Sequence, residues 1–236
     1  MAISTYSELK TAVAAWLDRT DLDDYMDDFI RLGEVYLMHG GGSCEPLRVR
    51  DMETTVSLTR FVTNPDGADS GGDSVGDFGG PIVIVAPEYA DYYELPSDFL
   101  SAKSITALTS PRRPLEFITP SGADKLYQDR LSGSPNHYMV VGNILTALPY
   151  TSSEIELVYY KSLEGLSATN DSNWLLAKNP DLYLRVVQMQ AAEFIKDQQQ
   201  AGIMMGLVDK YVSQLNDAEA FDDYRNVGLN LSGVVV

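Results

Sequence analysis

The stretch NPDLYLRVVQMQAAEFIKDQQQ, residues 179–200, decides the fold of this 236-residue chain. Asn179 is a residue type that caps helices, and Pro180 suits a first helical position, where its missing N–H needs no partner. Apolar residues on more than one face predict a helix that is buried on several sides. They are Leu182, Tyr183, Leu184, Val186, Val187, Met189, Phe194 and Ile195. We therefore expect a helix from Pro180 to about Gln200 that is packed on several sides. Its neighbours could include other subunits as well as other helices of the same chain.

Two amphipathic segments near the N-terminus are candidate neighbours. Thr5 and Glu8 form a capping-box pattern before a first helix, and a second helix is expected over residues 22–39. Glycines at positions 40–42 end the second helix, because Gly accepts the left-handed conformation of a helix C-cap. The expected apolar stripes are Tyr6, Leu9, Val13, Trp16 and Leu17 in the first helix, and Leu22, Tyr25, Phe29, Leu32 and Tyr36 in the second.

A further helix is expected from Ile203 to about Ala220, with its own apolar stripe. The residues from Arg225 to Val236 show no helical pattern. The expected stripe consists of Met204, Leu207, Val208, Tyr211, Leu215 and Ala218.

The middle of the chain has the alternating pattern of half-buried strands. Strands are expected at residues 52–58, 82–86, 92–95, 101–108, 115–118 and 155–159, with a hairpin of 138–141 and 144–148 around Gly142-Asn143. Thr119 and Pro120 are expected to open a small helix. Residues 64–80 are rich in Gly, Asp and Ser, so we expect a mobile loop there.

These elements predict an α+β fold: a helical bundle of the N- and C-terminal helices, an inserted β-rich module and an extended C-terminal tail. The expected boundaries place the helical core at residues 1–44 and 165–222. The β-rich module occupies residues 45–164, and the tail residues 223–236.

Charge and cysteine content limit the class of protein. A formal net charge of −17 disfavours a broad grip on DNA phosphates or on an anionic membrane. The single cysteine, Cys44, excludes an intramolecular disulfide and a zinc site built on several thiolates. No secretory signal and no apolar run of the length of a membrane span is evident, which together with the single cysteine fits a protein that folds in a reducing cytoplasm.

A search for chemistry gives no catalytic, cofactor-binding or metal-binding residues. His39 and His137 lie in no nucleophile or metal motif, so both are interpreted as structural. The Asp-rich loop at 64–80 lacks the tight spacing and terminal Glu of a calcium loop, although a calcium site there stays an alternative. Arg112 and Arg113, between two prolines, form an ordinary surface turn or a contact for a carboxylate or a DNA backbone.

Several segments in order resemble the head-to-tail adaptor proteins of tailed bacteriophages, including short-tailed-phage adaptors, connectors and tail tubular proteins. The resemblance covers roughly residues 3 to 220, and its most specific part extends from Glu156 to Leu184, followed by the helix with Ala191–Phe194. The matching segments are LRVRDME at 47–53, YELPSDFL at 93–100, RLSGSP at 130–135, ELVYY at 156–160, NWLL at 173–176, NPDLYL at 179–184 and AAEF at 191–194.

The resemblance implies a structural virion protein of the neck or tail, without catalytic residues. Such proteins form rings of usually about twelve copies beneath the portal, extend the DNA channel and carry the tail nozzle or tail fibres. The implied partners are further copies of the chain, the portal protein and the nozzle or fibre proteins. Double-stranded DNA would pass through the lumen without specific binding, and neither a membrane nor a small-molecule substrate is implied.

The candidate subunit or portal interface consists of Leu182, Tyr183, Val186, Phe194, Leu229, Leu231, Val234, Val235 and Val236. The tail residues among them are expected to be disordered in the free subunit and extended against the portal or a neighbouring adaptor. The alternative from another class is a glycan- or receptor-binding virion module. In that reading Tyr89, Tyr92, Tyr93 and Trp174 would stack on sugars.

Overall fold

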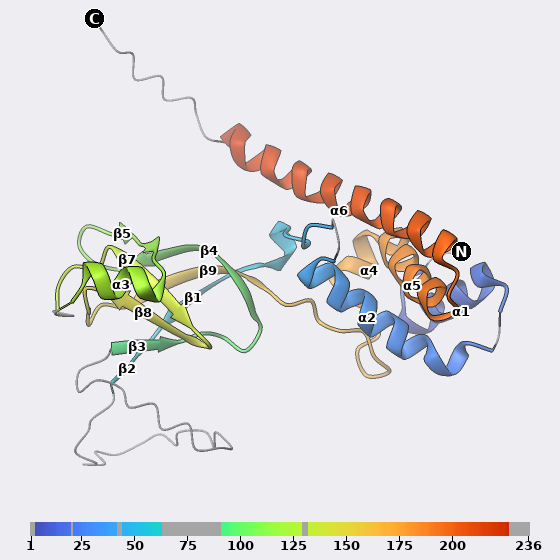
Figure 1. Cartoon of the computed structure of the whole chain (residues 1–236), viewed down its shortest axis with the longest axis horizontal. Coiled ribbons are helices and arrows are strands. Elements are labelled where there is room, and N and C mark those ends of the chain that lie inside the picture. The colour runs from blue at the N-terminus through green and yellow to red at the C-terminus, as the bar shows by residue number, and fades with distance from the viewer. Residues whose placement is uncertain (1–2, 20, 42–43, 63–90, 129–131, 227–236) are drawn as a thin grey trace, which may run out of the picture. The chain divides into compact units, whose positions relative to one another are not determined.

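The computed structural model describes residues 3–19, 21–41, 44–62, 91–128 and 132–226 (Figure 1). The chain divides into two compact units. One, the helical unit, combines Met1–Glu53 with Lys161–Val236, and the other, the β unit, is Thr54–Tyr160. The expected loop at 64–80, the expected strand at 82–86 and the tail residues from 227 onward lie outside the described residues.

The helical unit is built around α5, which spans Pro180–Phe194. Helix α5 contacts α1 (Tyr6–Leu17), α2 (Met26–His39), α4 (Trp174–Lys178) and α6 (Gln198–Asn226). Two short 3₁₀ helices, Asp23–Tyr25 and Arg50–Met52, flank α2. Apart from Phe194 at its end, the apolar residues of α5 are therefore buried against helices of the same chain, and no second subunit is needed to bury them.

Short-range sequence signals correctly predicted some of the helix ends but not all of them. The capping box of Thr5 and Glu8 at α1 is confirmed, and Gly40 ends α2 with a φ of 73°. Helix α5 ends six residues before the expected Gln200. Lys196 adopts a left-handed φ of 62°, and Asp197 accepts a hydrogen bond from the Gln200 N–H, as a capping residue does. The last helix consequently begins at Gln198 instead of Ile203 and extends to Asn226.

Two of the expected apolar stripes are partly wrong. Trp16 at the end of α1 is 65% exposed. Tyr25, in the 3₁₀ helix before α2, and Leu32, in α2, are exposed, while the buried face of α2 contains Gly33. A Cβ at Gly33 would lie 3.0 Å from Cγ1 of Val186, so the glycine allows α2 to approach α5 closely. The other residues of the buried face of α2 are Met26, Phe29, Ile30, Glu34 and Leu37.

The β unit contains two sheets, with strand orders β1-β9-β4-β5 and β2-β3-β8-β7-β6. The predicted hairpin is confirmed: β7 and β8 pair antiparallel with Val141 opposite Ile144, and Gly142 takes a φ of 61°. The small helix α3, Pro120–Leu126, is capped by Thr119 as expected. The strands are β1 Glu53–Leu58, β2 Arg60–Val62, β3 Asp91–Glu94, β4 Phe99–Ala107, β5 Arg113–Pro114, β6 Glu116–Phe117, β7 His137–Val141, β8 Ile144–Leu148 and β9 Ile155–Lys161.

Alternate residues of β9 point into one apolar core, as their spacing predicts. Ile155, Leu157 and Tyr159 pack there with residues of β3, β4 and β8, among them the fully buried Tyr93. Helices at both ends of the chain and sheets in the middle confirm the predicted α+β class.

Candidate functional site

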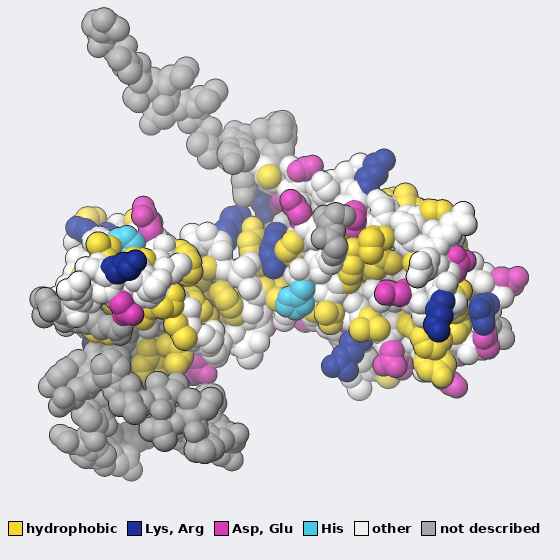
Figure 2. Space-filling model, in the orientation of Figure 1, with side chains coloured by type: hydrophobic (Ala, Val, Ile, Leu, Met, Phe, Trp, Pro, Cys, Tyr) yellow, Lys and Arg dark blue, Asp and Glu magenta, His cyan; other side chains and the backbone are white. Residues whose placement is uncertain are grey.

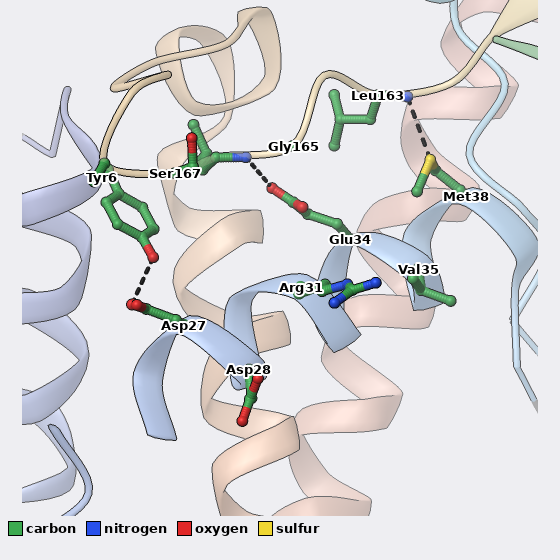
Figure 3. A pocket seen from close by; sticks show the side chains of 12 residues that line it. Tyr6, Asp27, Asp28, Arg31, Glu34, Val35, Met38, Leu163, Gly165 and Ser167 are labelled. Atoms are coloured by element: carbon green, nitrogen blue, oxygen red, sulfur yellow. Dashed lines mark hydrogen bonds between the residues drawn. The ribbon is translucent and has the colours of Figure 1, made fainter. Parts of the chain in front are cut away.

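The main polar feature inside the helical unit is the buried carboxylate of Glu34, which is only 5% exposed. It accepts hydrogen bonds from the Tyr183 hydroxyl at 2.6 Å and from the Leu166 N–H at 2.8 Å. Glu34 lies on α2, as Figure 3 shows, whereas Tyr183 lies on α5 and Leu166 in the segment that follows β9. One side chain thus fastens two helices and an irregular segment together.

Asn173 completes this network. Its Nδ2 donates to the Tyr183 hydroxyl at 2.9 Å and to the Glu164 carbonyl at 2.8 Å. Its Oδ1 accepts from the Leu176 N–H and so caps α4. A Cβ at Gly165 would come within 3.1 Å of Glu34 Oε2, so the backbone passes close to the carboxylate. The network therefore fixes residues 164–176 against the bundle.

Burial sets the ionisation of this network. Desolvation raises the pKa of Glu34, and the hydrogen bonds from Tyr183 and Leu166 oppose part of that rise. Burial and the neighbouring Glu34 carboxylate also raise the pKa of Tyr183, which stays a hydroxyl donor. The arrangement is that of a structural joint in which each donor has an acceptor.

A cleft of about 530 Å³ lies beside Glu34 and is lined by residues of α1, α2 and the segment 163–168 (Figure 3). At its edge Asp27 accepts from the Tyr6 hydroxyl and from Lys10 Nζ, and these bonds lower the pKa of Asp27, the bond from Lys10 most. The remaining charged lining residues are Asp28 and Arg31. Among the described residues, no group of three or more His, Cys, Asp or Glu side chains is placed to hold a metal ion.

The other residues singled out in the sequence have local roles. His39 lies in the last turn of α2, and His137 Nδ1 is 2.6 Å from the Tyr127 hydroxyl. Cys44 is buried, which raises the pKa of its thiol to about 12. Arg112 forms two exposed hydrogen bonds with Glu156, at 3.3 and 3.4 Å. Arg113 donates to Asn136, so both arginines have partners within the β unit.

The candidate interface residues of α5 divide into two groups. Leu182, Tyr183 and Val186 are fully buried among the chain's own helices, so the expectation that they face another subunit is corrected. Phe194 is 50% exposed and packs on Tyr25 and Phe29, with ring centroids 4.9 and 5.3 Å apart. Leu229, Leu231 and Val234–Val236 lie outside the described residues.

One of the aromatic residues expected for a glycan site is inaccessible to a sugar. Tyr93 is fully buried, and its hydroxyl donates to the carbonyls of Thr151 and Ser153. Tyr93 therefore has no free face on which a sugar could stack. Trp174 begins α4 in the helical unit, whereas Tyr92 lies on β3 of the β unit. Tyr89 lies outside the described residues.

Sequence reasoning missed the exposed apolar surface of the helical unit. Figure 2 shows hydrophobic side chains gathered over α2 and α6 on the face drawn. The sequence signal was present, since Tyr25, Leu32 and Val35 follow helical spacing, but it equally fits a buried stripe. Among the residues of this unit whose burial the structure describes, the large exposed apolar ones are Trp16, Tyr25, Leu32, Val35, Phe194, Ile203 and Met205.

Comparison with known protein families gives a match over nearly the whole chain. The family described as SU10 adaptor protein matches residues 4–229. No curated protein matches the chain. Within the described parts of the chain, no helix combines the length and apolar character needed to cross a membrane.

Proposed function

This chain belongs to the SU10 adaptor protein family, and from that membership we propose that it is the head-to-tail adaptor that docks beneath the portal. The family match over residues 4–229 confirms the resemblance to phage adaptors found in the sequence. The protein is a structural adaptor of a phage and a component of the virion. That match is the observation that carries the proposal.

In the proposed arrangement, about twelve copies close into a ring that continues the DNA channel below the portal. The ring also forms the platform to which the tail nozzle or tail fibres attach. The exposed apolar surface of the helical unit supports an assembling protein, because such patches mark interaction sites more often than they serve a monomer.

Charge supports a passive role toward DNA. Twelve copies of −17 would total about −200. A lumen with an excess of carboxylates repels phosphates, so DNA would pass without being held. The two adjacent arginines of the β unit do not alter this, since Arg112 is already engaged by Glu156.

The test is electron cryomicroscopy of the chain mixed with its candidate portal, beside imaging of intact virions. We expect a ring on the tail-facing side of the portal, coaxial with its channel. Density at a fibre tip or on the capsid surface, with none at the neck, would contradict the proposal.

The C-terminal residues are proposed to strengthen portal binding. Leu229, Leu231 and Val234–Val236 are apolar, and residues 227–236 include no charged side chain. Truncation after Asn226 should leave the far-UV spectrum and unfolding midpoint of the protein unchanged but weaken portal binding at least tenfold. Unchanged binding in a pull-down with the portal would remove the tail from the interface.

A further inference from the structure

The helical unit leaves an apolar face of α2 uncovered. Tyr25 and Leu32 are 45% and 52% exposed, and Val35 continues the same stripe at a spacing of three residues. Phe194 from the end of α5 extends it, with its ring 4.9 Å from that of Tyr25. The one acidic residue within the stripe is Asp28, which is exposed. We call Tyr25, Asp28, Leu32, Val35 and Phe194 the α2 face.

A second uncovered face lies on α6. Gly202, Ile203, Gly206 and Lys210 recur at helical spacing on the side opposite the buried Val208. Ile203 is 52% exposed, and a Cβ built on either glycine would meet nothing within 4 Å. We call Gly202, Ile203, Gly206 and Lys210 the α6 face.

The composition of the α6 face is unusual for this chain. Residues 198–207 contain no charged side chain, although the chain has a net charge of −17. Glycine destabilises a helix interior relative to alanine, yet two glycines occupy this helix side by side on its open surface. A partner's side chains can therefore approach the backbone of α6 closely there.

Charge points to a second copy of this chain as the occupant. Copies of a protein this acidic repel one another over most of their surface, so a contact needs regions that are poor in carboxylates or that pair a carboxylate with a cation. The α6 face has Lys210 as its charged residue, and the α2 face has Asp28. Within the described residues neither of these two side chains forms an ion pair.

We propose that the α2 face of one copy docks on the α6 face of the next. The inference rests on the ring put forward as the function, and it names the surfaces that join the ring. Different faces on the two sides of a contact make it heterologous, which is the type that can close into a ring. Pairing of two α2 faces would instead bring Asp28 against Asp28, which like-charge repulsion disfavours.

Two single-cysteine variants test the contact, Leu32→Cys for the α2 face and Ile203→Cys for the α6 face. The native Cys44 is buried with a pKa of about 12, so it should not react. The full-length variants are mixed, treated with a flexible bismaleimide that tolerates a shift of one helical turn, and resolved on a denaturing gel. Val141→Cys, which is equally exposed on the β unit, is the matched control.

We expect a cross-linked dimer in the mixture at least fivefold above the level given by either variant alone or by the control mixed with either variant. A second arm introduces Asp28→Lys and Lys210→Asp. Each should reduce the cross-linked yield severalfold, and the two together should restore it. A dimer from Leu32→Cys alone, or a mixture that only equals the control, would overturn the proposed contact.

The two levels of the proposal fail separately. If the wild-type protein forms a ring on the portal but the cysteine variants give no cross-link, the adaptor function is supported and these two faces do not form the ring contact. A cross-linked pair in a protein that never binds the portal would support the contact and count against the portal-docking function.

Discussion

The helical unit and the β unit bury their polar groups in different ways. In the β unit, the hydroxyl of Tyr93 donates to the carbonyls of Thr151 and Ser153, and the surrounding core is apolar. In the helical unit, the ionisable Glu34 accepts a hydrogen bond from the Leu166 N–H and so holds the segment around Leu166. Both groups fix an irregular segment to a regular core, but only the carboxylate links stability to pH.

The largest effect is expected for Glu34→Ala. The change leaves the Tyr183 hydroxyl and the Leu166 N–H without their acceptor and opens a cavity, so the unfolding free energy should fall by about 4 kcal/mol. Glu34→Gln is the matched control, because it keeps an acceptor oxygen and should cost about 1 kcal/mol. Hydrogen exchange should report the loss in the helical unit and leave the β unit protected. Equal losses in both variants would show that the hydrogen bonds contribute little.

Removing one hydroxyl from each unit compares the two networks directly. Tyr183→Phe deprives a buried carboxylate of a donor, and it should destabilise the helical unit by about 2 kcal/mol. Tyr93→Phe removes a bond between neutral groups, so a loss of about 1 kcal/mol is expected. Denaturant unfolding of the full chain, followed by exchange in each unit, measures both. A larger loss for Tyr93→Phe would reverse the comparison.

Phe194→Ala should have a smaller effect than its size suggests. A fully buried phenylalanine would cost about 3–5 kcal/mol on truncation. Since Phe194 is 50% exposed, we expect a loss of about 1 kcal/mol in the thermal unfolding of the subunit. A loss above about 3 kcal/mol would place the ring in the core, contrary to the structure.

The smallest expected effect is a difference in pH dependence. The pKa of folded Glu34 is raised above its ordinary value of 4.5, so the folded state holds a proton that the unfolded state has released. Its contribution to stability therefore decreases as the pH rises from about 4.5 to the folded pKa, by at most about 1.4 kcal/mol per pH unit, and is constant above that.

The Glu34→Gln variant should lack this pH-dependent contribution to stability, because glutamine does not titrate. The measurement is the difference between the pH profiles of wild type and Glu34→Gln, in which the effects of the other carboxylates cancel. Identical slopes between pH 4 and 7 would mean that Glu34 has an ordinary pKa in the folded protein.

Features set by neighbouring residues were predictable from the sequence. The capping box at Thr5, the hairpin at Gly142, the start of α5 at Pro180 and the alternation of β9 each depend on contacts within a few residues. The family resemblance was likewise contained in the order of short segments between Leu47 and Phe194.

The tertiary structure decided which of the apolar residues are covered. Tyr25 and Met26 both suit a buried stripe, and only the position of α5 against Gly33 selects the face with Met26. The burial of Glu34 follows from the same choice, because a carboxylate enters a core only where donors from distant segments meet it. Sequence periodicity indicates that a helix is amphipathic. The segments that cover the apolar face of α2 lie more than a hundred residues away in the chain, so only the packed structure identifies them.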